Sequence, residues 1–138
     1  MIDYIRKTAS GLLEIVTDNH KVTVDQALTG YLNHLAQQSL RSIDTILKQT
    51  RKILKCSQKV PIYINNGLVL IQYYPLRSPS TLLINYLSIA HITDERNDTC
   101  TLYFKSGATL VLNNLKRLIK QKELAKKLID YLDLNMLK

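Results

Sequence analysis

The stretch from residue 59 to residue 75 reads KVPIYINNGLVLIQYYP, and it decides the fold class of this chain. Two runs rich in β-branched and aromatic residues, Val60–Asn65 and Leu68–Tyr74, flank the dipeptide Asn66-Gly67. Asn-Gly between two such runs is a strong signal for a β-hairpin, because both residues tolerate the positive φ angles of a tight turn. The stretch therefore predicts two antiparallel strands joined by a short turn.

Further strands are predicted on either side of this hairpin. Ser106-Gly107 lies between two more apolar runs and predicts a second hairpin, with a weaker turn signal. The long apolar run Leu82–Thr93 has no clear periodicity, but its β-branched and aromatic residues favour a strand. Residues 75–80 contain two prolines and predict a loop, because proline lacks the N–H that a strand ladder needs. The additional predicted strands are Leu12–Thr17, Leu82–Thr93, Cys100–Lys105 and Ala108–Leu112.

Helical periodicity marks the chain before and after this β region. From about Val24 to Leu54 there is no proline, and Gly30 is expected to weaken or divide the helix. In Ser39–Lys55 and again in Asn113–Leu132, apolar residues recur at helical spacing with basic residues on the opposite side. The candidate N-caps are Asp25 or Thr23 for the first helix, Ser39 or Ser42 for a separate second helix, and Asn113 or Asn114 for the last.

The order of these elements predicts an α+β fold in a single domain covering residues 1–138. We expect a curled antiparallel sheet of about five strands, helices in the N-terminal half and a C-terminal helix. The 138 residues are 46% hydrophobic and 22% charged, a composition typical of globular domains and unlike a disordered or fibrous chain. No stretch approaches the ~20 apolar residues of a membrane span, and no secretory signal is recognised. We therefore expect a soluble cytoplasmic protein.

The positive charge is concentrated in two segments. Lys and Arg number 19 against 11 acids, which gives a net charge of +8. Residues 41–59 hold six bases and only Asp44, residues 116–127 hold six bases and only Glu123, and the remainder is slightly acidic. A charge of this size favours an anionic partner such as nucleic acid, an acidic protein or a membrane surface.

The side chains do not form a recognisable catalytic set, so we expect a protein that is not an enzyme and has no cofactor or metal. The three histidines are scattered, with none at metal-ligand spacing, and four glycines are too few for a Gly-rich phosphate loop. His91 lies in an apolar run and is interpreted as a core residue. Cys56 is interpreted as a half-buried structural thiol, and both cysteines are expected to be reduced. Because most of the tyrosines lie in the predicted strands, we interpret them as core residues or cross-strand pairs and not as a platform for base stacking.

The two basic helices are candidates for binding a polyanion. One lysine-rich helix face is usually a solubility feature, but two such faces in one small domain are as compatible with function as with solubility. Clustered Lys and Arg suit a phosphate backbone, because neutralising the phosphates releases counterions. This interpretation depends on the two faces coming together in space. The candidate DNA-binding residues are Lys48, Arg51, Lys52, Lys55, Lys59, Arg77, Ser78, Lys116, Arg117 and Lys120.

A series of short motifs runs through about residues 40–130 of the chain. In order, these motifs are Lys59-Val60-Pro61-Ile62-Tyr63-Ile64, Tyr74-Pro75, Ser78-Pro79, Ala90-His91-Ile92 and Phe104-Lys105-Ser106-Gly107. The series, followed by a terminal helix, resembles the ComK family of competence transcription factors. Lys59, Arg77 and Ser78 occupy matched motif positions, whereas the other candidates come from the charge pattern alone.

The resemblance implies a sequence-specific DNA-binding activator of DNA-uptake genes that contacts AT-rich minor grooves. It also implies oligomers on paired sites and control by an adaptor with a Clp-type protease. The chain departs from the family pattern in having Thr45-Ile46 near the usual Gly-Arg pair and no tryptophan, with Tyr86 in that region. Its ends also look shortened. These departures support an alternative, a non-enzymatic module that binds a regulatory partner. Docking on a membrane is disfavoured because Phe104 is the only phenylalanine and there is no tryptophan.

Overall fold

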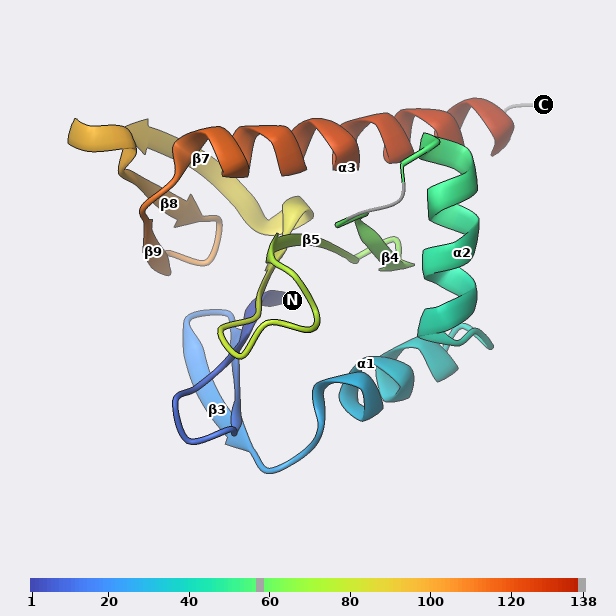
Figure 1. Ribbon diagram of the computed structural model, residues 1–138, viewed down its shortest axis with the longest axis horizontal. Coiled ribbons are helices and arrows are strands. Elements are labelled where there is room, and N and C mark those ends of the chain that lie inside the picture. Colours follow the sequence, from blue (N-terminus) through green and yellow to red (C-terminus); the bar gives the residue numbers. More distant parts are fainter. Residues whose placement is uncertain (57–58, 137–138) are drawn as a thin grey trace.

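The computed structural model describes residues 1–56 and 59–136, with side chains described as far as residue 133. It contains three helices, nine strands and two short 3-10 turns, arranged as an α+β fold (Figure 1). The helices are α1 (Leu28–Gln37), α2 (Ile43–Leu54) and α3 (Leu115–Met136), and the turns are Tyr86–Ser88 and Arg96–Asp98. The strands are β1 (Ile2–Lys7), β2 (Leu13–Thr17), β3 (His20–Val24), β4 (Ile62–Asn65), β5 (Leu68–Tyr74), β6 (Leu82–Asn85), β7 (Ile89–Asp94), β8 (Cys100–Phe104) and β9 (Thr109–Leu112).

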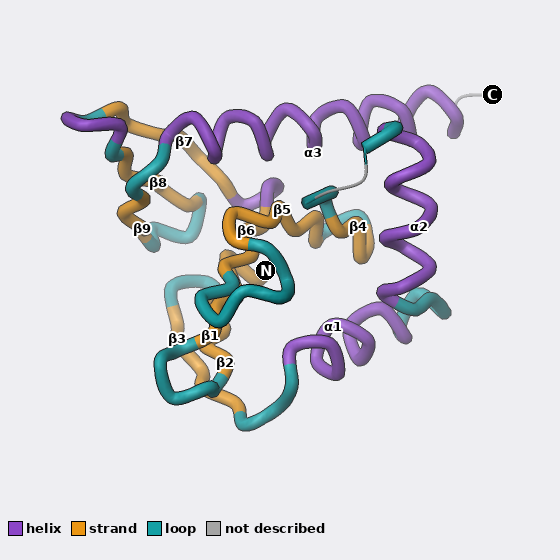
Figure 2. The backbone as a smooth tube through the Cα atoms, in the orientation of Figure 1, coloured by secondary structure: helices purple, strands orange, loops and turns teal. Residues whose placement is uncertain are grey.

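Six strands form the main sheet in the order β3-β2-β1-β6-β5-β4, and every neighbouring pair is antiparallel. The remaining strands form a second sheet in the order β7-β8-β9 (Figure 2). The α+β class, the antiparallel pairing and the C-terminal helix are therefore confirmed. The strand count is larger than expected, because the first 24 residues contribute three strands of which only β2 was predicted, and because the run Leu82–Thr93 forms two strands.

The main sheet is covered on both faces, which explains the unbroken apolar run in β5. Val69 and Ile71 face a core shared with β8, β9 and α3, whereas Leu68 and Leu70 face a core shared with α1 and α2. A strand buried on both faces needs apolar residues at successive positions, so apolar and polar residues do not alternate along it. β5 therefore lies at the centre of the molecule, and the loop that follows it is anchored in the core.

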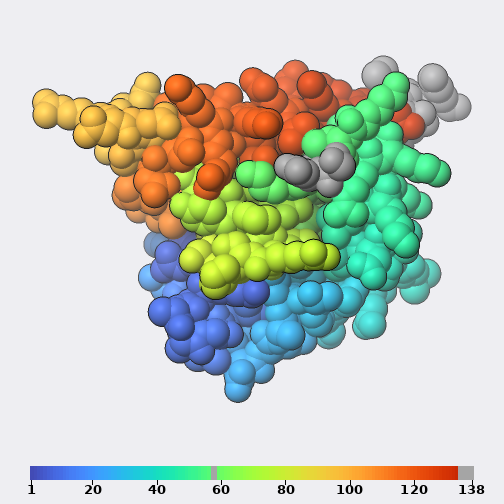
Figure 3. Space-filling model, viewed as in Figure 1, coloured from blue at the N-terminus to red at the C-terminus, as the bar shows by residue number. Residues whose placement is uncertain are grey.

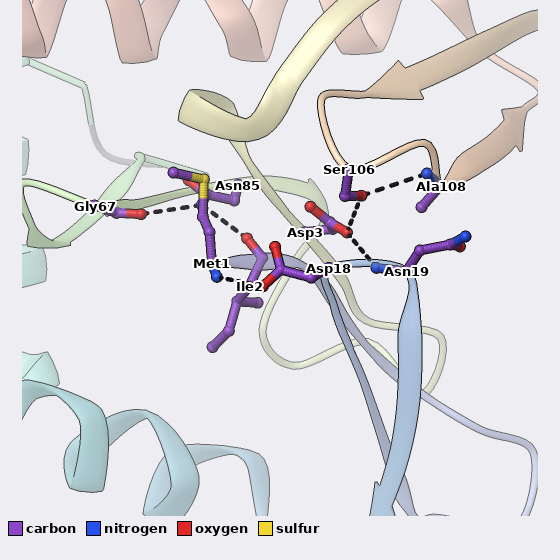
Figure 4. Close-up of polar contacts among 9 residues, drawn as sticks. All are labelled: Met1, Ile2, Asp3, Asp18, Asn19, Gly67, Asn85, Ser106 and Ala108. Carbon is purple, nitrogen blue, oxygen red and sulfur yellow. Dashed lines mark hydrogen bonds and ion pairs between the residues drawn. The ribbon is translucent and has the colours of Figure 1, made fainter.

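Two buried polar side chains connect segments at the sheet centre, and one of them links the two sheets (Figure 4). Asp3 of β1 is 1% exposed and accepts a hydrogen bond of 2.7 Å from Ser106, in the β8–β9 turn. Asn85, at the end of β6, is fully buried and donates through Nδ2 to the carbonyl oxygens of Ile2 and Gly67 at 2.8 and 3.2 Å. These contacts satisfy buried polar groups that would otherwise destabilise the core.

Two of the three helix N-caps lie at predicted residues. α2 begins at the N-cap Ser42, whose side chain accepts from the backbone N–H of Thr45, and α3 begins after Asn114, whose Oδ1 accepts from the N–H of Arg117 at 3.0 Å. α1 is shorter than expected, contains Gly30, and has Ala27 at its N-cap with no side-chain hydrogen bond. The prediction of Asp25 or Thr23 as its cap is therefore wrong, because β3 and its connection occupy that region.

Two strand predictions need correction. Leu82–Thr93 is not one strand, because the 3-10 turn Tyr86–Ser88 divides it into β6 of the main sheet and β7 of the second. The β4–β5 hairpin is present, but neither Asn66 nor Gly67 has a positive φ. The side chain of Asn65 instead stabilises the turn by accepting from the N–H of Gly67 at 2.8 Å.

Among the described residues, no helix is long and apolar enough to cross a membrane.

Candidate nucleic-acid interface

The cations of α2 lie on one flank of the helix. Its inner side packs on the main sheet, with Ile43, Ile46, Leu47 and Thr50 buried. At about 100° per residue, Lys48, Arg51 and Lys55 fall within about 60° of one another on the exposed side, and Lys52 lies about 40° from Lys48 on the same side. The amphipathic pattern of the sequence therefore places all four predicted cations in solvent.

A groove between α2 and the Pro75–Thr81 segment, which we call the ridge loop, brings predicted residues from three parts of the chain together. Its cavity volume is about 770 Å³. The predicted cations that line it are Lys48 and Arg51 from α2, Lys59 before β4 and Arg77 from the ridge loop, and Asp44 is also in the lining. Figure 3 shows this face, with the ridge loop in yellow-green and α2 to its right in blue-green. We call this cavity the α2 groove.

The ridge loop is held in one shape by a buried threonine. Thr81 is 1% exposed, and its Oγ1 lies 3.0, 3.2 and 2.6 Å from the carbonyl oxygens of Pro75, Leu76 and Ser78. The N–H of Leu76 also donates to the buried Gln72 side chain at 3.2 Å. A loop with this many internal contacts presents Arg77 to solvent in a fixed position.

Ser78 lies at a predicted site position, but the structure places it within the ridge loop. The Ser78 side chain is partly buried and its Oγ accepts from the N–H of Ser80 at 3.0 Å, while its carbonyl oxygen accepts from Thr81. These contacts assign Ser78 a role in the shape of the loop.

The α2 groove retains its positive charge. In the part of the chain that the structure describes, none of the predicted cations forms a salt bridge, since the ion pairs there join other residues. Four cations against the single carboxylate of Asp44 therefore give a strongly positive cavity. Such a cavity attracts phosphate groups and concentrates them at its surface.

The predicted cations of α3 do not join this groove. Lys116, Arg117 and Lys120 lie in the first turns of α3, whereas α2 approaches α3 near Tyr131, with which Lys52 shares a small hollow. Fifteen residues of helix separate Lys116 from Tyr131, or about 22 Å. Figure 1 shows the start of α3 and the whole of α2 at opposite sides of the molecule. Lys116, Arg117 and Lys120 therefore do not form one cradle with the α2 groove, contrary to the expectation for these three residues.

A second hollow, on the other side of the ridge loop, was missed by the sequence analysis. Its volume is about 630 Å³, and its lining includes Arg6 and Lys7 at the end of β1, Glu14 and Ser80. Arg6 pairs with Glu14 at 2.9 Å. These two cations escaped notice because the first 40 residues carry more acids than bases, so charge counting pointed elsewhere. We call this cavity the β1 hollow.

Aromatic residues and thiols have mainly structural positions. Tyr73 is 1% exposed, and its pKa is raised chiefly by burial. His91 is exposed, contrary to its interpretation as a core residue, because β7 is an edge strand. It stacks on Tyr103 of the neighbouring strand with ring centroids 4.4 Å apart. Cys56 is half-buried, as predicted.

The described residues show no arrangement for holding a metal. Between residues 1–56 and 59–136, no three His, Cys, Asp or Glu side chains gather closely enough to bind one. The described surface instead presents exposed cations from several chain segments.

Comparison with known proteins gave one match. The family model described as ComK protein matches residues 3–133, nearly the whole chain. No curated protein and no solved structure matches the chain.

Proposed function

This chain belongs to the ComK family, a family of competence transcription factors, and we propose that it binds duplex DNA through the α2 groove. The observation that carries the proposal is the gathering of Lys48, Arg51, Lys59 and Arg77 in one cavity, with no salt bridge among the described residues to neutralise them. Cations from three chain segments fit a phosphate backbone better than they fit a small anion, because the charge is spread along a groove.

The ridge loop suggests how sequence preference arises. Arg77 is exposed on a loop that the Thr81 contacts make rigid. Narrow minor grooves of AT-rich DNA have an enhanced negative potential that attracts an inserted arginine. We infer that Arg77 enters the minor groove of AT-rich sites and that the cations of α2 contact the adjacent phosphates.

The remaining properties follow from the family. We infer that the protein acts in the cytoplasm as a sequence-specific regulator, that it self-associates on paired sites, and that an adaptor directs it to a protease. Its role in competence requires DNA as partner and no cofactor.

Titration of an AT-rich duplex at several salt concentrations tests the proposed function. The wild type is expected to bind, with log K falling linearly against log salt because phosphate contacts release counterions. Arg51→Ala is expected to lower the slope by about 0.9 at all sequences, as one phosphate contact is lost. Arg77→Ala is expected to reduce the preference for AT-rich over GC-rich duplex.

Lys105→Ala is the matched control, because Lys105 is exposed and lines a separate small hollow with His91 and Lys122. It is expected to bind as the wild type does. Absence of wild-type binding at low salt would exclude the function, and equal slopes for Arg51→Ala and Lys105→Ala would exclude the α2 groove.

One observation favours a second candidate, a module that binds a regulatory protein. Leu40 is 95% exposed with a φ of 58°, in a loop fixed by Ser39 and Arg41, whose side chains donate to the carbonyl oxygen of Ile64 at 3.3 and 3.0 Å. An apolar side chain held outward in a strained conformation suits insertion into a partner. Retention of a protein partner that Leu40→Ser abolishes, without retention of duplex DNA, would select this candidate.

A further inference from the structure

The ridge loop separates two cavities that both contain cations. Pro75, Leu76 and Arg77 line the α2 groove, while Ser80 lines the β1 hollow on the other side. The backbone N–H of Lys7 donates to the carbonyl oxygen of Thr81 at 3.0 Å, so the end of β1 is attached directly to the loop. The loop is therefore a rigid projection between two hollows, with a cation on each side.

The β1 hollow contains a cation that no carboxylate of the described residues neutralises. Glu14 pairs with Arg6 at 2.9 Å and lies 3.9 Å from Lys21, so Arg6 is largely neutralised. Lys7 forms no salt bridge with any residue that the structure describes. Lys7 is thus the cation of this lining that is able to meet an external anion.

Arg117 is outside this lining, but it lies over two tyrosines of the hollow and adds a second available cation beside it. Its guanidinium lies 4.9 and 5.6 Å from the ring centroids of Tyr74 and Tyr73, and both tyrosines line the hollow. The two tyrosine hydroxyl groups lie 3.3 and 3.0 Å from Oδ1 of Asn113, which fixes the rings under the guanidinium. Stacking on aromatic rings orients a guanidinium while leaving its N–H groups free to donate.

We propose that the β1 hollow, through Lys7 and Arg117, holds the second phosphate backbone of the duplex whose first backbone occupies the α2 groove. This inference rests on the proposed function and extends it. The ridge loop then lies between the two backbones, as a projection inserted in the minor groove must, since that groove is only about 6 Å wide with phosphates along both edges. The first turn of α3 thereby contributes to DNA binding although it does not approach α2.

The first test is the salt dependence of binding to an AT-rich duplex for Lys7→Ala, Arg51→Ala and the double variant. Lys7→Ala keeps the backbone contact to Thr81 and is expected to lower the slope of log K against log salt by about 0.9, as Arg51→Ala does. The double variant is expected to lose about twice that amount, because the two residues contact different phosphates. Lys105→Ala again serves as the control.

The second test locates the two contacts on the DNA. Single phosphates of each strand are replaced in turn by uncharged methylphosphonates, and the loss of affinity is measured. A methylphosphonate at the phosphate that Lys7 contacts is expected to weaken binding of the wild type but not of Lys7→Ala. The same holds for Arg51→Ala at the phosphate that Arg51 contacts. We expect the two phosphates to lie on opposite strands, across one minor groove. Positions on the same strand for both variants would overturn the inference.

The outcomes separate the inference from the function on which it depends. Wild-type binding that Arg51→Ala weakens and Lys7→Ala leaves unchanged would overturn the β1 hollow and leave the α2 groove in place. Failure of the wild type to bind any duplex at low salt would overturn both. A Lys7→Ala protein whose unfolding matches the wild type in urea shows that a changed slope reports DNA contact.

Discussion

At the scale of single residues, the buried thiol of Cys100 makes stability depend on alkaline pH. Cys100 is fully buried in β8, and its pKa is raised above the ordinary value of 9.0, first by burial and then by Asp98, Asp94 and Glu95. The folded protein therefore keeps the thiol proton at a pH where the unfolded chain loses it. The stabilisation is complete below about pH 9 and is lost as pH rises through the folded pKa.

We expect the free energy of unfolding to fall as pH rises above about 9, by at most about 1.4 kcal/mol per pH unit from this group. Cys100→Ala is expected to show a shallower fall, although its stability at pH 7 is lower because a small cavity forms. Urea unfolding at each pH measures both. Parallel pH profiles for the two proteins would show that Cys100 is not responsible.

At the scale of elements, the ridge loop depends on one hydroxyl group. The Thr81 hydroxyl is buried and has a single proton for three carbonyl oxygens within 3.2 Å. We expect Thr81→Val to lower the free energy of unfolding by about 0.5–1.5 kcal/mol, because the loop loses the hydroxyl hydrogen bond while Pro75 and Ser78 keep backbone donors to their carbonyl oxygens. Thr81→Ser keeps the donor and is expected to lose less.

The same pair of variants connects loop shape with binding. Thr81→Val is expected to weaken binding to AT-rich duplex, because Arg77 is no longer presented in a fixed position, while Thr81→Ser is expected to bind nearly as the wild type. Urea unfolding and duplex titration measure the two effects. Equal results for valine and serine in both measurements would mean that the hydroxyl group does not shape the loop.

Local sequence signals predicted elements well where the residue that gives the signal also makes the contact that forms the cap or turn. Ser42 and Asn114 cap their helices as their side chains allow, and Ser106-Gly107 forms a hairpin turn with a φ of 96° at Gly107. The division of Leu82–Thr93 was not predictable from periodicity. It depends on Asn85, whose Oδ1 accepts from the N–H groups of Leu87 and Val69, the second of which is 16 residues away.

At the scale of the whole molecule, contacts between distant segments limited the prediction of the site. The α2 cations were found because helical spacing places them together within 12 residues. Lys7 was missed because its position beside the ridge loop follows from the pairing of β1 with β6, about 75 residues later. The expected meeting of the α2 cations with those at the start of α3 failed for the same reason, since no local pattern specifies where the sheet directs each helix.

The pairing of β1 with both β2 and β6 also makes the N-terminal strand a determinant of overall stability. Ile5 is fully buried between Ile15 and Leu83. We expect Ile5→Ala to lower the free energy of unfolding by about 2–5 kcal/mol, because it leaves a cavity at the sheet centre. Val22→Ala, on edge strand β3 where Val22 is 54% exposed, is expected to change it by less than about 0.5 kcal/mol. Urea unfolding compares them, and similar losses for both variants would show that β1 is peripheral to the fold.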